Sequence, residues 1–137
     1  MKEQIIGIEV LEDPKYEKRE ERLELAEMPN LSPELIDLLS RDEDWEVRQA
    51  IVELHELTKE QIEQFSKSNN RKARSAIAHH PNLTAEQIER LSQDENEYVR
   101  HSIACRRDLT LKQIKHLSQD EDWHVRATIA NNPYAQK

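Results

Sequence analysis

The sequence "LTAEQIERLS" (Leu83–Ser92) and the "DENEYVRHSI" that follows it (Asp94–Ile103) decide the fold, because the chain repeats both at a fixed interval. Four leucines, each the first residue of such a segment, are 26 residues apart: Leu31, Leu57, Leu83 and Leu109. The first segments read LSPELIDLLS, LTKEQIEQFS, LTAEQIERLS and LTLKQIKHLS, and the second read DEDWEVRQAI, SNNRKARSAI, DENEYVRHSI and DEDWHVRATI. An unbroken period of this length is typical of proteins that stack small helical or strand units.

Each repeat carries two helix-start signals. The first is a hydroxyl N-cap, at Ser32, Thr58, Thr84 and Thr110. After each threonine, a glutamine three residues later completes a capping box. The second signal is an Asp or Asn N-cap, at Asp44, Asn70, Asn96 and Asp122. Apolar residues follow it at spacing i, i+3, i+4, which predicts a second amphipathic helix.

Helices of about nine or ten residues are too short to be stable alone, so the pairs must stack. Three columns of residues are expected to form the core: Leu39, Phe65, Leu91, Leu117; Ile51, Ile77, Ile103, Ile129; and the small Val52, Ala78, Ala104, Ala130. We predict an all-α, right-handed helical-repeat solenoid of short helix pairs with a 26-residue period, in which some helices can be 3-10. It would form a single domain divided into an N-terminal cap and half repeat (1–30), repeats 31–56, 57–82 and 83–108, and a last repeat with the C-terminal end (109–137).

The joint recurrence of the caps, an arginine and a turn such as Asn132-Pro133 resembles the leucine-rich repeat variant family of bacterial helical solenoids. More distantly, the pattern is similar to HEAT and armadillo repeats. The resemblance covers about residues 18–134 and implies alternating short α and 3-10 helices. Two features depart from the family: the period is a little longer, and the cysteine cluster of some relatives is absent. The resemblance implies neither an iron–sulfur cluster nor a known reaction.

Composition excludes several classes of function. With one cysteine, the chain has no intrachain disulfide and cannot by itself form a multi-thiolate metal site. With one glycine, it has no phosphate-binding loop or dinucleotide fingerprint. The net charge of -8 opposes a duplex-binding surface spread over the whole molecule. No apolar run reaches the length of a membrane span, and acidic residues occupy the place of a signal-peptide cleavage site, so we expect a soluble cytoplasmic protein with no membrane partner.

Both ends of the chain depart from the repeat. Residues 1–12 are expected to cover the first helices, as a helix or as a strand from Ile5 to Val10. Asp13-Pro14 is a suitable N-cap and N1 pair for a longer first helix ending at about Ala26. At the other end, "NNPYAQK" supplies no polar capping helix, so a homodimer or a partner is expected to cover the C-terminal face.

An arginine recurs at the same register in every repeat and in the N-terminal half repeat: Arg22, Arg48, Arg74, Arg100 and Arg126. We interpret this arginine column as a structural ladder to the acidic turns, since an arginine beside the core needs a partner. An anion-binding ladder is the weaker interpretation.

The second helices expose a more varied set of residues than the acidic first helices. The candidate partner-binding residues are Trp45, Arg71, Lys72, Tyr98, His101, Trp123 and His124. Aromatic and arginine side chains are enriched at binding hot spots, while a tryptophan at N1 can instead pack across a repeat junction. The expected function is a non-catalytic protein-interaction or regulatory module, which binds through this row and through the C-terminal end.

The alternative function is nucleic-acid binding through a local basic patch. In "KSNNRKAR" (Lys67–Arg74) the acidic turn is replaced by basic residues, which either pair with flanking acidic turns or bind a phosphate backbone. Arg106 and Arg107 would add a second basic turn.

No combination of residues predicts a catalytic site, so we expect no enzyme, no cofactor and no metal. His79, His80 and Cys105 are the only candidates for a zinc site, and His79 and Cys105 occupy the same column of adjacent repeats. Their predicted separation is at the limit for sharing one ion.

Overall fold

The computed structural model describes residues 4–135, and these residues form nine α-helices, three 3-10 helices and no β-strand. A single parallel bridge joins Ile6 to Leu31. The chain divides into two compact units, Met1–Leu57 and Thr58–Lys137. The prediction of an all-α protein is confirmed for the described residues.

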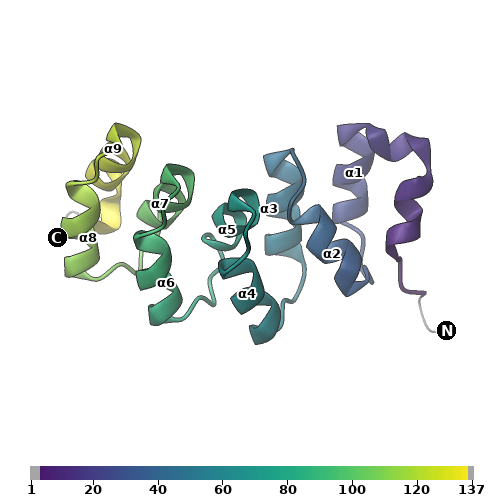
Figure 1. Ribbon diagram of the computed structural model, residues 1–137, viewed down its shortest axis with the longest axis horizontal. Coiled ribbons are helices and arrows are strands. Elements are labelled where there is room, and N and C mark those ends of the chain that lie inside the picture. The colour runs from purple at the N-terminus through teal and green to yellow at the C-terminus, as the bar shows by residue number, and fades with distance from the viewer. Residues whose placement is uncertain (1–3, 136–137) are drawn as a thin grey trace. The chain divides into compact units, whose positions relative to one another are not determined.

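The first unit contains two 3-10 helices and three α-helices (Figure 1). They are η1 (Ile8–Glu12), η2 (Pro14–Glu17), α1 (Arg19–Ala26), α2 (Pro33–Leu39) and α3 (Trp45–Leu54). α3 packs against both α1 and α2. Leu25, Leu35, Leu39, Val47 and Ile51 are almost completely buried and form its core.

The predicted continuous helix from Pro14 to Ala26 is wrong. Asp13 does cap a helix, since its carboxylate accepts from the backbone N–H of Lys15 at 3.0 Å, but that helix is the short η2. The backbone is extended at Lys18, and α1 begins after it. The guanidinium of Arg22 donates to the carbonyl oxygens of Tyr16 and Glu17, which a continuous helix would have used for its own hydrogen bonds. Of the two alternatives for residues 1–12, the structure shows the 3-10 helix η1 from Ile8 and, at Ile6, only an isolated bridge instead of a strand. Residues 1–3 lie outside the described part of the chain.

The second unit consists of three helix pairs and a short 3-10 helix near its end. They are α4 (Lys59–Ser66) with α5 (Arg71–Ile77), α6 (Ala85–Ser92) with α7 (Glu97–Ala104), α8 (Leu111–Ser118) with α9 (Trp123–Asn131), and η3 (Pro133–Ala135). α7 packs against α5 and α9, while α6 packs against α4 and α8. In Figure 1 the α5, α7 and α9 row lies above the α4, α6 and α8 row.

Local hydrogen bonds explain where these helices begin. The hydroxyls of Thr58, Thr84 and Thr110 each accept a hydrogen bond from the backbone N–H of the glutamine three positions later. The side-chain oxygen of that glutamine accepts in turn from the backbone N–H of the threonine. Each bond satisfies a donor that the first helical turn leaves without an intrahelical partner. The predicted capping boxes are therefore confirmed, as are the Asp and Asn caps of the second helices.

The core columns are buried as predicted, with one exception. The phenylalanine and leucine column and the isoleucine column are at most 4% exposed. In the small column, Val52, Ala78 and Ala104 are buried but Ala130 is exposed. Ala130 lies on α9, the last helix of this row among the described residues.

Candidate functional site

Three large aromatic side chains lie at the beginnings of second helices and are exposed. Trp45 on α3 is 64% exposed, Tyr98 on α7 is 64% exposed and Trp123 on α9 is 62% exposed. Tyr98 and Trp123 belong to the same compact unit, and their helices pack against each other. Most of each tryptophan is therefore exposed, so packing across a repeat junction, the alternative interpretation, would involve only the remaining part of the residue.

The caps fix the backbone from which these side chains project. Asn96 accepts from the N–H of Tyr98 at 2.9 Å, and Asp122 accepts from the N–H of His124 at 2.9 Å. Lys72 has the same position on α5, where Asn70 accepts from its N–H at 2.8 Å. Lys72, Tyr98 and His124 are thus the second residues of three successive helices in one row.

We define the first-turn surface as the outward residues of these three helix beginnings: Arg71, Lys72, Tyr98, Trp123 and His124. The ring of His124 stacks on the ring of Trp123, with 3.9 Å between centroids. Arg71 is exposed and Lys72 is half-buried, and neither forms an ion pair with any residue in the range 4–135. His101 lies one turn further along α7 and is half-buried.

The arginine column provides a contrast, because three of its members are committed to internal pairs. Arg22 binds Asp42, Arg74 binds Asp94 and Arg100 binds Asp120, each through Nε and Nη2 to the two carboxylate oxygens. Arg100 and Asp120 are both buried. Burial alone would raise the pKa of Asp120, but Arg100 and the N–H of Asp122 hold that pKa below its usual range.

The other two arginines of the column form no ion pair with a described residue. Nη1 of Arg48 donates to the carbonyl oxygen of Asp42, and Nη1 of Arg126 donates to that of Asp120. Residue 68, which is 20 positions after Arg48, is a serine where the equivalent residues 94 and 120 are aspartates. Burial lowers the pKa of Arg48, and the nearby charges of Asp42 and Asp44 offset this effect only in part.

The basic turn after α7 is only partly available to a ligand. Nη1 of Arg106 donates to the carbonyl oxygens of Ala78 and His80, at 2.8 Å each. Its Nε and Nη2 bind the carboxylate of Asp108. Arg106 is therefore a structural tie between α5 and α7 rather than a free cation, which weakens the nucleic-acid interpretation of this turn.

The residues considered for zinc do not assemble into a metal site. His80 is buried, and its Nδ1 accepts from the N–H of Asn82, while His79 and Cys105 are exposed. Among residues 4–135, no group of three or more His, Cys, Asp or Glu side chains is able to hold a metal ion. None of the helices described is long and apolar enough to cross a membrane.

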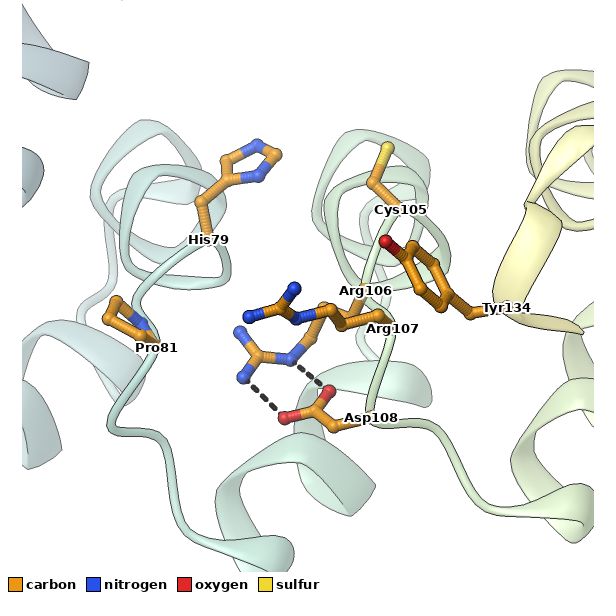
Figure 2. Close-up of a pocket in the computed structure, with 7 residues that line it drawn as sticks. All are labelled: His79, Pro81, Cys105, Arg106, Arg107, Asp108 and Tyr134. Carbon is orange, nitrogen blue, oxygen red and sulfur yellow. Dashed lines mark hydrogen bonds and ion pairs between the residues drawn. The ribbon is translucent and has the colours of Figure 1, made fainter.

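A pocket of about 430 Å³ lies beside the turn that follows α7, within the second unit (Figure 2). Its walls come from three parts of the chain: His79 with Pro81, residues 105–108, and Tyr134. The sequence did not identify this pocket, since Tyr134 lies outside the repeated segments. The equal spacing of residues 79 and 105 in adjacent repeats was the only signal that these walls face each other.

Comparisons with protein-family models, with characterised proteins and with solved structures find no match to this chain.

Proposed function

We propose that the chain is a non-catalytic interaction module that binds a protein partner through the first-turn surface. The observation that carries this proposal is the exposure of Tyr98 and Trp123, at 64% and 62%, on two helices that pack against each other. Large aromatic side chains held on rigid elements have little conformational entropy to lose on binding and dominate the energy of many interfaces.

The charges of this surface indicate the character of the partner. Arg71, Lys72 and the two aromatic residues present cations next to apolar rings. A complementary segment would place an aliphatic or aromatic side chain between Tyr98 and Trp123 and acidic residues near Arg71 and Lys72. Trp45 has the same helix position as Trp123, at N1, and is proposed to bind in the same manner within its own unit.

We extend the proposal to the repeat architecture. The pattern resembles leucine-rich repeat variant proteins, and we propose a right-handed solenoid with a 26-residue period for the whole chain. We also propose that the protein is cytoplasmic and that it forms a homodimer through its C-terminal end.

A capture experiment with quantitative follow-up tests the proposed surface. Immobilised protein is used to capture partners from a cell extract, and the affinity of each purified partner is then measured for the wild type and for Tyr98→Ala and Trp123→Ala. We expect each substitution to weaken binding about thirtyfold, the effect of losing about 2 kcal/mol at a hot spot.

Leu111→Ala is the matched control, since Leu111 is 61% exposed in the same unit but lies on α8, in the other row. Equal loss of binding in Leu111→Ala would contradict the proposed surface. Salt distinguishes the nucleic-acid alternative, because binding to a phosphate backbone weakens steeply with salt. Steep salt dependence together with loss of binding in the charge reversals Arg71→Glu and Lys72→Glu would favour that alternative.

A further inference from the structure

The pocket beside the turn after α7 contains a free guanidinium. Arg107 is exposed and forms no hydrogen bond or ion pair with any residue described by the structure. Figure 2 shows its side chain extending across the pocket towards the segment that carries His79 and Pro81. An arginine in such a position offers two parallel N–H donors to a carboxylate or a phosphate.

The charges of the lining favour an anion with a single charge. Three formally charged side chains line the pocket, Arg106, Arg107 and Asp108. Arg106 binds the carboxylate of Asp108 through hydrogen bonds of 2.9 and 2.8 Å, and the charge of Arg107 also contributes to lowering the pKa of Asp108. The lining therefore carries one net positive charge, although the whole chain has a net charge of -8. A bound monoanion would balance that positive charge.

The remaining walls provide a hydroxyl and apolar surface. In Figure 2 the hydroxyl of Tyr134 points towards the pocket, and this hydroxyl has no hydrogen bond within residues 4–135. The ring of Tyr134, Pro81 and the side chain of Cys105 present apolar atoms next to the cationic group. A pocket of about 430 Å³ falls within the usual range for small-molecule sites.

From this arrangement we propose that the pocket binds a carboxylate that carries an apolar or aromatic substituent. Arg107 pairs with both carboxylate oxygens, the hydroxyl of Tyr134 donates to one of them, and the substituent lies against Pro81 and the ring of Tyr134. A small carboxylic acid and the C-terminal residue of a peptide both present this chemistry. The site is independent of the first-turn surface, because it lies at the opposite ends of α5 and α7.

Cys105 provides a direct measurement of occupancy. It is the only cysteine of the chain and it lines the pocket, so alkylation by N-ethylmaleimide reports on this site alone. Cys105 is exposed as a residue, but partial burial of its thiol raises the thiol's pKa, so the reaction is run in mildly alkaline buffer. It is followed by the mass of the proteolytic peptide that carries Cys105, which excludes any reaction at amines. We expect 3-phenylpropanoate to slow alkylation of the protein in a saturable manner, and the neutral 3-phenylpropanamide to give no protection at the same concentration.

Variants separate the proposed contact from a general effect of charge. Arg107→Ala should raise the concentration required for half-protection by about tenfold or more, as expected for a lost charged hydrogen-bond partner. Tyr134→Phe should raise it by a smaller factor. Arg71→Ala should leave it unchanged, because Arg71 is also an exposed arginine without an ion pair but lies at the other end of α5. An unchanged melting temperature of Arg107→Ala establishes that its fold is intact.

Several outcomes would overturn the proposal. Equal protection by the amide would show that the carboxylate is not recognised, and undiminished protection in Arg107→Ala would remove the proposed contact. Stronger protection by inorganic phosphate than by 3-phenylpropanoate would reject the class of ligand. A short peptide ending in phenylalanine, compared with its C-terminally amidated form, then identifies the source of the carboxylate. Protection by the peptide with the free carboxylate supports a peptide terminus as the ligand. Protection by the small acid alone supports a metabolite.

Discussion

His80, Arg106 and Asn132 are 26 residues apart, and their side chains bind backbone groups at or just beyond the ends of α5, α7 and α9. Arg106 and Asn132 each donate to two carbonyl oxygens of the preceding repeat. His80 and Asn132 each accept from the N–H two residues later, that of Asn82 and Tyr134 respectively. Three different residue types therefore form hydrogen bonds with backbone groups at one register position. Of these, asparagine does so without a titratable side chain, unlike His80.

Protonation of His80 should destabilise the protein. Burial, and then the charge of Arg106, lower the pKa of His80 from 6.5, so the unfolded chain takes up this proton at a higher pH than the native protein does. The contribution of neutral His80 to stability is complete above about pH 6.5 and is lost as the pH falls below that value. The loss is limited to about 1.4 kcal/mol per pH unit.

The substitution His80→Asn should reduce this pH dependence. Urea unfolding measured between about pH 7.5 and pH 5.5 is expected to show a smaller fall in the free energy of unfolding for the variant than for the wild type. His124→Asn is the control, because His124 is exposed and the wild-type slope should persist. Identical slopes for the wild type and His80→Asn would show that His80 does not resist protonation in the folded protein.

At the scale of the elements, adjacent helices are joined by two kinds of polar tie. Arg74 and Arg100 reach from α5 and α7 to the acidic turns before α7 and α9. In the other row, Glu63 of α4 accepts from Arg90 and Gln87 of α6, and these bonds lower its pKa to about 2. Ties of this kind align helices that are individually too short to be stable.

A comparison of two members of the arginine column tests how much these ties contribute. Arg100→Met should destabilise the protein by about 3 to 5 kcal/mol, because it leaves the buried carboxylate of Asp120 without its partner. Arg48→Met should cost about 1.5 kcal/mol, because Arg48 hydrogen-bonds to the carbonyl oxygen of Asp42 and forms no ion pair with a carboxylate among the described residues. Chemical denaturation of both variants provides the measurement.

The double variant Arg100→Met with Asp120→Asn should recover part of the lost stability, because the unpaired charge is removed. An equal cost for Arg48→Met and Arg100→Met would contradict the distinction between paired and unpaired arginines.

The elements that the sequence predicted correctly depend on local interactions. An N-cap and the backbone N–H from which it accepts are two or three residues apart. The capping box of Thr84 and Gln87 can therefore be predicted from their spacing alone. The break at Lys18 was missed because it depends on Arg22 reaching back to two carbonyl groups. The pocket was missed for a related reason, since His79 and Tyr134 line one cavity only through the packing of three helix pairs.

At the scale of the whole molecule, the second compact unit has the components of an independent domain. Its helices supply their own core, including Phe65, Ile77, Leu91 and Ile103, all at most 4% exposed. The buried pair of Arg100 and Asp120 lies entirely within Thr58–Lys137, as does the pocket beside Arg107. The polar ties and the apolar core of this unit thus both come from one continuous stretch of sequence.

We therefore expect a fragment that begins at Thr58 to fold by itself, with a helical far-UV circular dichroism spectrum and a cooperative urea transition. The hydroxyl of Thr58 caps α4 from within the fragment, so truncation at this residue keeps the first capping box. Introducing Ile103→Ala into the fragment should abolish the transition or shift it to much lower urea, since truncating a fully buried isoleucine costs about 2 to 5 kcal/mol. A spectrum of unfolded chain, or a melt that Ile103→Ala leaves unchanged, would mean that the core of this unit requires residues before Thr58.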